Sequence, residues 1–466
     1  MNPKKWCGGI LAIALIALAS GCGSGSAGAP VVQPQSGMVF VSGTDASLPS
    51  VVSFQVDITG LTVSDGVNPP VSILSTTQTV DFARLNGLQT LLDLNSIPAG
   101  TYTSVTATLA NPQIMYLDVT NPQTTPPTIA TLNGTTTPPA MLTQSSVTIP
   151  LATPLVVSMG NVIGLRFEFD IRHSVLQNNG QITGMVNPML NLKAITPSDA
   201  DAYIDDFVAG VVSANVGGNS FIIQGPHGHQ FTVNVNGQTE WENGETLSDL
   251  TNTSIVAITG TLDKTAATFL ADSVAIVSQD GFHAGGLVTF VNPATGPATS
   301  FDLYVRDVLP SGTGFTSGQI STIDLTGNEK YFIQRIHNPF TTFFFNPSLL
   351  VPGQHVSIGG PFSGGTLTVK RVVLRHEGHT GAWVVGSTNL NNGTFQFDSN
   401  GLAGVLFNGP ITVYTSSFTT FKGGLTGLSG LTGNTAIPLR VVGLILKDPI
   451  SGQPLFVARS VEELTD

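Results

Sequence analysis

The stretch Leu165–Arg172, with the sequence LRFEFDIR, decides the fold class of this chain. Its four apolar residues alternate with four charged ones, and a period of two predicts a strand with one buried face and one solvated face. The run Phe54–Ile58 alternates in the same way. Similar short runs, broken by Gly, Asn and Pro, recur along the chain, and long stretches of helical period are nearly absent. We therefore expect an all-β protein, with an N-terminal β-sandwich followed by three tandem small β-barrels.

Composition narrows the possible partners. Apolar residues make up 41% of the chain, which is enough for packed cores. Charged residues make up only 10%, against roughly 25% in ordinary globular chains, and the formal net charge is −12. An acidic surface repels nucleic acid and anionic lipid headgroups, so we expect neither as a partner.

The N-terminus has the order of an export signal. Lys4 and Lys5 precede the apolar run Ile10–Ala19, which is too short to span a bilayer and has the length of a signal-peptide core. The run leads into Leu18–Cys22, with the sequence LASGC. This arrangement resembles the lipobox of bacterial lipoproteins. A plain secretory signal cut at an Ala-x-Ala-like site is the alternative.

The lipoprotein resemblance implies that residues 1–21 are removed and that Cys22 receives a diacylglycerol and a fatty acyl group such as palmitate. Cys7 lies in the removed part, so acylation would give a role to the single cysteine that remains. Residues 22–37, rich in Gly and Ser, predict a flexible tether. Gly23, where an aspartate would signal retention in the inner membrane, indicates the outer membrane, at its periplasmic face or at the cell surface. No other cofactor is expected.

Residues 38–197 are predicted to form the β-sandwich. The turn Ile97–Tyr102, with the sequence IPAGTY, resembles the pro-x-gly-x-tyr corner of transthyretin-like and carboxypeptidase-regulatory-like sandwiches. The region also resembles an uncharacterised domain-of-unknown-function family of secreted bacterial lipoproteins, through Asp45–Ala46 and Asn187–Pro188. That family has no known catalytic residue to transfer. Residues 198–206 are expected to be a linker.

The C-terminal half contains an internal repeat, predicted over residues 207–279, 282–376 and 379–464. Each unit has an opening glycine, a Thr-x-aromatic motif, a strand that ends in glycine and a closing strand. These marks are Gly210, Trp241 and Gly260 in the first unit, Gly286, Phe343 and Gly360 in the second, and Gly381, Phe421 and Gly443 in the third. Loops of varying length between fixed marks are typical of a repeated fold. The units predict small closed barrels and resemble a second domain-of-unknown-function family, of OB-like barrels found in tandem in secreted bacterial proteins.

Two pairs of histidines are candidate metal ligands. His376 and His379 lie in the sequence HEGH, and His227 and His229 lie in PHGH. The first pair departs from the i, i+4 spacing of helical zinc sites, and no third ligand is placed by spacing. The alternative is that these histidines are solvated turn residues.

Four aspartates before the first repeat, Asp199, Asp201, Asp205 and Asp206, are candidate calcium ligands. Calcium prefers clustered oxygen ligands. The pattern lacks the glycine and the distal glutamate of a calcium-binding loop, and a solvated linker is the alternative.

Glu168 and Asp170 lie on one face of the predicted strand, about 6–7 Å apart. Paired carboxylates at such distances serve glycoside hydrolysis. Because Arg166 and Arg172 flank them on the same face, we expect surface ion pairs instead.

The aromatic residues of the repeat motif, Trp241, Phe343 and Phe421, are candidates for stacking on a ligand, with core packing as the alternative. The chain shows no nucleophile elbow, P-loop or dinucleotide fingerprint in a convincing context. We therefore expect a non-enzymatic, lipid-anchored cell-envelope protein with a structural or binding role, whose partner is a polysaccharide or an envelope protein. A carbohydrate-binding accessory module and a metal-dependent hydrolase with a site between domains are the alternatives.

Overall fold

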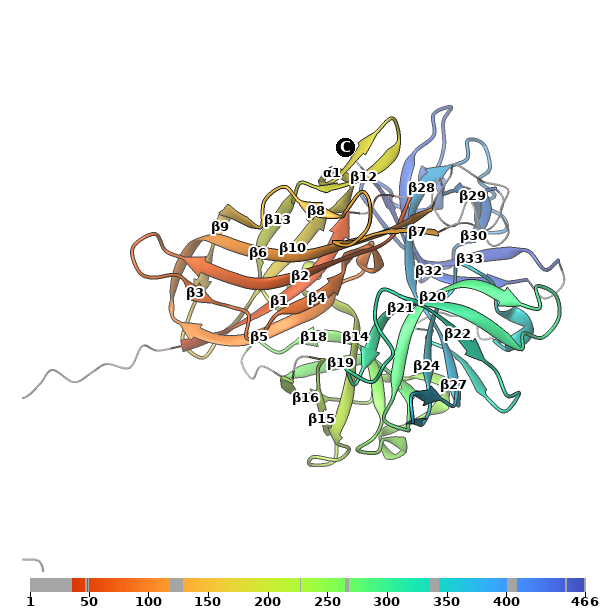
Figure 1. Cartoon of the computed structure of the whole chain (residues 1–466), viewed down its shortest axis with the longest axis horizontal. Coiled ribbons are helices and arrows are strands. Elements are labelled where there is room, and N and C mark those ends of the chain that lie inside the picture. The colour runs from red at the N-terminus through yellow and green to blue at the C-terminus, as the bar shows by residue number, and fades with distance from the viewer. Residues whose placement is uncertain are drawn as a thin grey trace, which may run out of the picture. The chain divides into compact units, whose positions relative to one another are not determined.

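The computed structural model describes residues 36–46, 48, 50–117, 129–226, 228–264, 268–335, 343–399, 409–448 and 451–464. Of these residues 57% lie in strands and about 6% in helices, which confirms the predicted all-β class. The small sheets form a propeller-like ring that includes a closed five-stranded barrel (Figure 1). No helix in the described part of the chain is long and apolar enough to cross a membrane.

The N-terminal region, from Ser36 to Ile195, contains three sheets. The four-stranded sheet has the order β13-β10-β1-β5 and consists of β1 (Ser36–Ala46), β5 (Thr90–Pro98), β10 (Val162–Asp170) and β13 (Leu190–Ile195). The six-stranded sheet consists of β2 (Val51–Ser64), β3 (Val71–Ser72), β4 (Gln78–Asp81), β6 (Gly100–Leu117), β7 (Ile129–Leu132) and β9 (Ser146–Val157). The smallest sheet consists of β8 (Met141–Leu142), β11 (Val175–Asn178) and β12 (Gln181–Val186). Three short helices, η1 (Phe82–Leu85), α1 (Ile171–Ser174) and η2 (Ala200–Ala202), lie in this region or directly after it.

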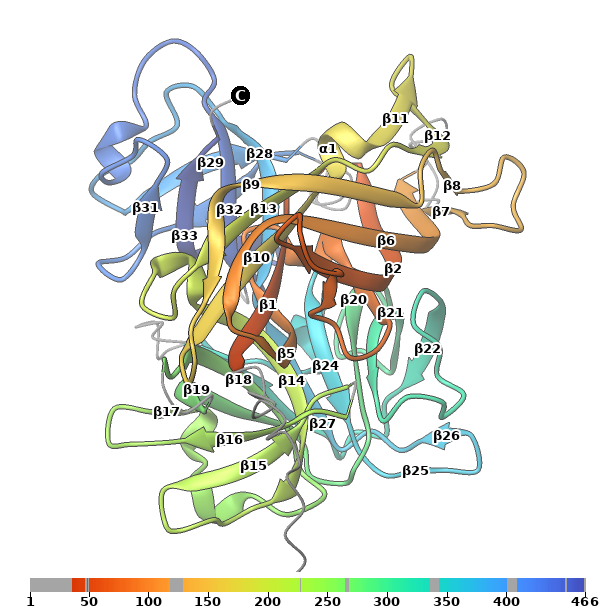
Figure 2. The ribbon, with the colours of Figure 1, turned by 90° about the vertical axis from the view of Figure 1, so that its left-hand side faces the viewer.

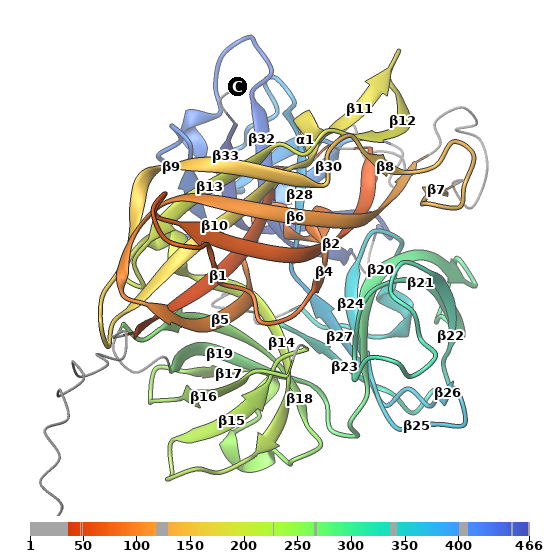
Figure 3. The same cartoon turned by 60° about the vertical axis from the view of Figure 1, so that its left-hand side comes forward.

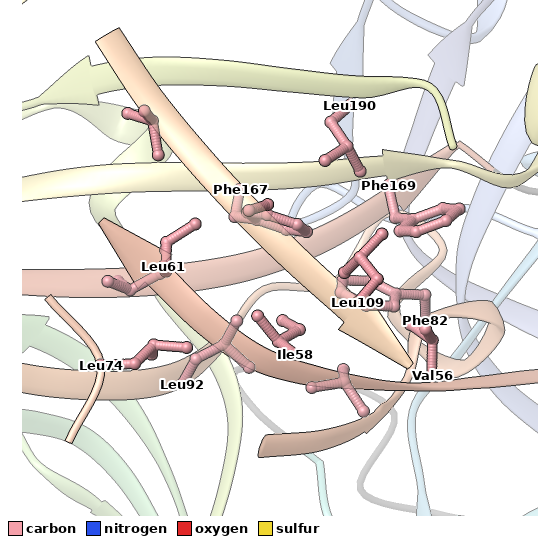
Figure 4. Packing of buried hydrophobic residues seen from close by; sticks show 14 of the residues in the cluster. Val56, Ile58, Leu61, Leu74, Phe82, Leu92, Leu109, Phe167, Phe169 and Leu190 are labelled. Carbon is pink, nitrogen blue, oxygen red and sulfur yellow. The ribbon is translucent and has the colours of Figure 1, made fainter. Parts of the chain in front are cut away.

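The two larger sheets share one hydrophobic core (Figure 4). Phe167 and Phe169 of β10 are fully buried, and their ring centroids lie 5.7 and 5.2 Å from that of Phe82 in η1. Phe54 of β2 contacts Phe169 at 4.8 Å between ring centroids. Aromatic pairs at such distances add to the free energy gained by burying their surface. The apolar face of the LRFEFDIR stretch is thus the centre of this core.

The predicted strand ends earlier than the alternation indicates. Asp170 is the N-cap of α1, and its carboxylate accepts a hydrogen bond from the backbone amide of His173 at 3.1 Å. This cap favours a helical turn over continued pairing, so Ile171 and Arg172 leave the sheet. The predicted corner is present as well, because Tyr102 at the start of β6 donates its hydroxyl to the Pro98 carbonyl oxygen at 2.8 Å.

Three further six-stranded sheets follow, which we call the first, second and third modules. The first module consists of β14 (Ile204–Ser213), β15 (Ser220–Gln224), β16 (Gln230–Asn234), β17 (Glu240–Trp241), β18 (Ile255–Leu262) and β19 (Phe269–Ser278). The second consists of β20 (His283–Asn292), β21 (Ser300–Leu309), β22 (Ile320–Asp324), β23 (Lys330–Ile333), β24 (His355–Gly359) and β27 (Arg371–Arg375), with the small hairpin β25 (Phe362–Ser363) and β26 (Thr366–Leu367). The third consists of β28 (Glu377–Trp383), β29 (Thr394–Asp398), β30 (Ile411–Tyr414), β31 (Thr420–Lys422), β32 (Pro438–Lys447) and β33 (Pro454–Glu463). Their short helices are η3 (Glu242–Gly244), η4 (Leu247–Asp249), η5 (Pro347–Leu349) and η6 (Leu428–Gly430).

The modules share one order of strand pairing (Figures 2 and 3). In the first module β16 pairs with β19, and in the third module β30 pairs with β33, so that five strands close a ring in each. In the second module β22 pairs with β21 alone among the described strands. The segment before β27 forms the hairpin β25–β26 there, which accounts for the open ring.

The recurrent glycines have a common physical reason. A Cβ atom on Gly260, Gly360 or Gly443 would lie 2.1, 2.1 or 2.0 Å from a backbone carbonyl oxygen of the segment that forms or enters the closing strand. No real Cβ atom comes so close, so glycine is required where the two backbones approach. At Gly260 and Gly443 the antiparallel pairing with the closing strand also shifts register.

The second module departs from the predicted repeat alignment. In the first and third modules the motif aromatics, Trp241 and Phe421, lie in short strands parallel to the closing strand. In the second module this place is taken by β23, whose Tyr331 pairs with Val372 of the closing strand. The predicted equivalence of Phe343 is therefore wrong, because a motif of three residues recurs by chance in a segment rich in Thr and Phe.

Three predicted boundaries fall inside strands. The third repeat, predicted from residue 379, begins inside β28, which starts at Glu377. β1 begins at Ser36, so the last two residues of the predicted tether belong to a sheet. β14 begins at Ile204, so Asp205 and Asp206 lie in a strand and not in a linker. Cys22, the signal segment and His227 lie outside the described residues.

Candidate functional site

A cavity of about 570 Å³ lies where the N-terminal region meets the first and second modules. Small-molecule sites usually measure roughly 300–1,000 Å³ and often lie between domains. The wall consists of Gln78–Asp81, Arg84, Leu85 and Thr90–Asp93 from the N-terminal region, of Phe207, Val208, Gly225, Pro226, His229 and Phe231 from the first module, and of Arg306–Leu309, Ser311, Gly312 and Gly314–Ser317 from the second. Three parts of the chain that are distant in sequence therefore build one wall.

The loop Ser311–Gly318 is seated on the N-terminal region. Gln55 of β2 donates to the Ser317 hydroxyl at 2.8 Å, and Gln113 of β6 donates to the Gly318 carbonyl oxygen at 3.0 Å. Gly318 has a φ of +87°, and a Cβ atom there would lie 2.6 Å from the Gln113 amide nitrogen. Glycine therefore permits both the left-handed backbone and the close contact. These contacts fix the second module's side of the cavity.

Four charged residues of the wall belong to a larger cluster. We call this cluster the junction network; it consists of Asp81, Arg84, Asp206, Arg306, Asp307, Arg375 and Glu377. Arg84 of η1 contacts Asp206 of β14 and also donates to Asp307 of β21 at 2.7 Å. The other oxygen of Asp307 lies 2.7 Å from Nε2 of the buried His283. Burial alone would lower the pKa of Arg84, but the two carboxylates raise it above its ordinary value. Arg84 is therefore held charged between two modules.

Arg306 joins the second module to the third and to the N-terminal region. Its Nη1 donates to Glu377 of β28 at 2.9 Å, and its Nη2 donates to the Val52 carbonyl oxygen at 2.7 Å. Its Nε lies 3.5 Å from Oδ2 of Asp81. Arg306 and Glu377 are 6% and 5% exposed, and a buried ion pair requires such close partners to offset desolvation.

Arg375 completes the junction network from β27. It contacts Asp206 and Gln334 and donates to the Ser357 hydroxyl at 2.8 Å. Burial favours the neutral form of Asp206, but the guanidinium groups of Arg375 and Arg84 outweigh it and lower the pKa of Asp206 to about 2. The carboxylate is thus ionised at neutral pH.

Three buried polar atoms of the cavity wall make no hydrogen bond within the described part of the chain. They are Oε1 of Gln78, Oδ2 of Asp81 and Nε of Arg306. Two are acceptors and one is a donor, and leaving such groups unpaired costs free energy. Each of them is fully buried, with less than 1 Å² exposed, so a ligand in the open part of the cavity does not reach it.

A second polar group lies at the edge of the cavity. Nε2 of His229 lies 2.6 Å from the Ser75 hydroxyl and 3.2 Å from Oδ1 of Asp93, and Ser75 donates to the other oxygen of Asp93 at 2.9 Å. The three residue types match a serine hydrolase triad, which uses one imidazole nitrogen for the serine and the other for the aspartate. Here both oxygens approach the same nitrogen. This arrangement suits a contact that ties the β15–β16 turn to the N-terminal region.

The candidate metal ligands are separated in the structure. His376 is the single residue between β27 and β28, and His379 lies within β28. An odd spacing in extended backbone places their side chains on opposite faces. Both are buried, at 4% and 8% exposure, so the alternative of solvated turn residues is wrong for this pair. No group of three His, Cys, Asp or Glu residues suited to a metal occurs among the described residues.

Burial and nearby cations keep these histidines in the neutral form at pH 7. Desolvation, reinforced by the charges of Arg459 and Arg375, lowers the pKa of His376 well below its ordinary value. Desolvation also lowers the pKa of His379, although Glu377 opposes this shift. The neighbouring His355, which contacts the His376 carbonyl oxygen, has its pKa lowered to about 4 by desolvation and by Arg84. All three are neutral at pH 7.

The candidate calcium ligands are engaged elsewhere. Asp199 accepts a hydrogen bond from the Thr196 amide, and Asp201 pairs with Lys193 at 2.6 Å. Asp205 pairs with Arg459 of the third module at 2.9 Å, and Asp206 belongs to the junction network. The four carboxylates thus have separate partners and do not converge on one ion.

The remaining candidates also have structural partners. Glu168 lies 3.3 Å from Arg166, and Asp170 lies 2.6 Å from His173, so this face carries paired charges. Trp241 packs near Phe221, with 6.4 Å between ring centroids. Phe421 and Phe343 are partly buried against the cores of the third and second modules.

No protein-family model matches the sequence, and no curated protein matches it either. The resemblances to lipoproteins, to β-sandwich families and to OB-like barrels therefore stay predictions.

Proposed function

We propose that this chain is a non-enzymatic, lipid-anchored cell-envelope protein that binds a polysaccharide or an envelope protein through the cavity at its module junction. The observation that carries the proposal is the joint construction of this cavity by the N-terminal region and two modules. Binding sites commonly lie at such junctions and combine apolar walls with a few polar groups.

The proposed architecture is an N-terminal β-sandwich followed by three tandem barrel repeats, over residues 38–197, 207–279, 282–376 and 379–464. Equivalent pairs of residues support it: Gly210 with Ile255, Gly286 with Val356, and Gly381 with Leu439. A repeated hydrogen bond supports it as well, since Thr239 and Thr419 donate to the Ala271 and Ala458 carbonyl oxygens, each at 2.8 Å. The proposal includes the resemblance to tandem OB-like barrels of secreted bacterial proteins.

A non-enzymatic role is supported by how the charges are used. The arginines of the junction network contact carboxylates, and His229 approaches Ser75 and Asp93 through one nitrogen. Buried ion pairs of this kind specify how surfaces pack. A kinetic screen with esters, peptides and glycosides should accordingly show no turnover above that of a heat-denatured sample.

The proposed location depends on acylation of Cys22 and is tested separately. We expect the wild-type protein in the outer-membrane fraction of envelopes and Cys22→Ser in the soluble fraction. Metabolic labelling with a fatty acid that carries an alkyne should mark the wild-type protein alone. Equal release of both proteins, with no label on either, would favour the plain secretory signal.

The binding role is tested by obstructing the cavity. Thr316 is exposed on the cavity loop, whereas Thr432 is exposed in the third module outside the cavity wall. The mature protein, Thr316→Trp and Thr432→Trp are immobilised and probed with separated polysaccharide and protein fractions of the envelope. We expect one fraction to bind the wild type and Thr432→Trp and to lose binding to Thr316→Trp. Unchanged binding to Thr316→Trp would place the binding surface elsewhere.

A further inference from the structure

β22 of the second module has an edge that no other described strand covers. In the first and third modules the equivalent strands, β16 and β30, pair with the closing strands β19 and β33. β22 pairs with β21 alone among the described strands. Figures 2 and 3 show it at the outer margin of its module. An uncovered strand edge is a template for pairing with a further strand.

The internal repeat shows what kind of group fits this edge. In the first and third modules the last residue of the strand, Asn234 or Tyr414, pairs with a residue of the closing strand. Asp324 is the last residue of β22, and it has no such partner in the described part of the chain. The segment that enters its closing strand folds into the hairpin β25–β26 instead. An extended polypeptide is therefore the group that occupies the equivalent place twice in this chain.

The backbone of β22 offers hydrogen-bonding groups along the uncovered edge. The pairing of β22 with β21 has no register shift. Gln319, just before the strand, accepts a hydrogen bond from the Val305 amide at 2.9 Å, and Leu325, just after it, donates to the Thr299 carbonyl oxygen at 2.9 Å. Because bonding alternates along an antiparallel pair, the residues that turn their backbone groups away from β21 are Ile320, Thr322 and Asp324. None of these groups has a hydrogen-bond partner among the residues that the structure describes.

The side chains beside the edge indicate the chemistry of an added strand. Ile320 is 48% exposed, and Thr322 and Asp324 are exposed on the same face of β22. Cross-strand neighbours stabilise a sheet when apolar side chains adjoin or opposite charges pair. The added strand should therefore carry an apolar residue beside Ile320 and a Lys or Arg beside Asp324, about 13 Å further along. The net charge of −12 also favours a basic partner.

We infer that the open edge of β22 binds an extended, basic segment of another protein, which adds to the second module as a strand. Recognition by strand addition uses main-chain hydrogen bonds for affinity and alternate side chains for specificity. The inference goes beyond the proposed function, because no residue of β22 lines the cavity. Occupation of the edge is therefore independent of a ligand in the cavity.

Thr322→Pro is the sharpest variant. Proline removes the amide hydrogen at the centre of the uncovered edge, so an added strand would lose a hydrogen bond there. Edge strands accept proline where the amide faces solvent, so the fold should persist. Thr322→Val is the matched control, because both variants lose the hydroxyl that donates to Asp302 at 2.7 Å, whereas valine keeps the amide. The two variants should melt at similar temperatures.

The experiment selects displayed random peptides of about ten residues on the full mature chain, with counter-selection on Thr322→Pro. We expect peptides without proline, in which an apolar residue and a Lys or Arg lie four positions apart. Synthetic copies should bind Thr322→Val as they bind the wild type. They should bind Thr322→Pro at least about tenfold more weakly, the value expected for one lost hydrogen bond.

Methylation of the peptide backbone tests the mode of binding. A strand bonds to its neighbour through alternate residues. Peptides that carry N-methyl groups on one alternate set of residues should lose binding, whereas those methylated on the other set should keep it. Equal binding of both methylated peptides would overturn the inference, because main-chain pairing could not then hold the segment.

Three other outcomes would also overturn it. Failure of every peptide to prefer the wild type over Thr322→Pro would mean that the edge binds no strand. Peptides that lose binding in Thr316→Trp but not in Thr322→Pro would occupy the cavity, which would refute strand addition and leave the proposed function standing. A wild-type dimer in analytical ultracentrifugation that Thr322→Pro dissociates would mean that a second copy of this chain covers the edge.

Discussion

Replacing Asp206 by asparagine tests whether the junction network holds the modules together as the structure indicates. Asp206 is 5% exposed and contacts both Arg84 and Arg375. The neutral amide of Asp206→Asn would leave two buried guanidinium groups short of one negative charge. Removing one partner of a buried ion pair typically lowers the free energy of unfolding by about 3–5 kcal/mol, and we expect a loss of this size at pH 7.

The pH dependence gives an independent measure of the same contact. The pKa of Asp206 falls from 3.8 to about 2 in the folded state, which corresponds to roughly 2–3 kcal/mol of folding free energy. Because the folded pKa is the lower one, this contribution is present above about pH 4 and is lost as the pH falls toward 2. Asparagine does not titrate, so the difference between wild type and variant should narrow over that range.

The assay is urea unfolding at pH 7, 4 and 3, followed by the fluorescence of Trp241 and Trp383 in the first and third modules. Asp280→Asn, which removes an exposed carboxylate, is the control and should differ little from the wild type. A loss below about 1 kcal/mol at pH 7, or a difference that stays constant between pH 4 and 3, would refute the reasoning.

Three further changes have outcomes that the structure defines. His355 has its pKa lowered from 6.5 to about 4, so the unfolded chain binds a proton at this site first, and the free energy of unfolding should fall by roughly 3 kcal/mol as the pH drops from 6.5 to 4. In His355→Gln this part of the loss should be absent from urea unfolding curves. Gly443→Ala would place a Cβ atom 2.0 Å from the Val457 carbonyl oxygen and should lower the free energy of unfolding by about 1–3 kcal/mol. A calorimetric melting temperature equal to that of the wild type would contradict this steric requirement for glycine. Thr419→Val removes the hydrogen bond to the Ala458 carbonyl oxygen and should lower the free energy of unfolding by about 1–2 kcal/mol. An unchanged midpoint of urea unfolding would argue against a structural role for the repeated threonine.

Local patterns predicted the fold class because strand periodicity is local. The alternation of Leu165–Asp170 depends on neighbouring residues, and it placed Phe167 and Phe169 in the core. The recurrent glycines were also visible in the sequence, since a Cβ atom at these positions would lie 2.0 to 2.1 Å from a backbone oxygen of the neighbouring segment. The motif around Phe343 predicted the wrong strand pairing, because a pattern of three residues also occurs by chance. In the structure Tyr331, and not Phe343, pairs with the closing strand of the second module.

The cavity could not be predicted in the same way. Arg84 and Asp307 are 223 positions apart, and Arg84 and Asp206 are 122 apart. No local pattern links such residues, since only the packing of whole sheets brings them together. One signal was available: Arg306 and Asp307 are charged neighbours inside the apolar strand SFDLYVRDVL. In a chain with 10% charged residues, adjacent charges within a buried strand indicate partners on other sheets.

The ion pairs of the junction network add little net stability, because the cost of desolvating buried charges offsets much of their attraction. Their effect is larger on which surfaces pack together, since any other arrangement would bury the same charges without partners. Arg306 joins the second and third modules through Glu377, and Arg459 joins the third and first through Asp205. Because Arg84 ties the N-terminal region to two modules, the cavity wall forms only when all these parts are assembled. A ligand bound there must therefore stabilise the assembly as a whole, and its addition should raise the unfolding transitions reported by Trp241 and Trp383 together.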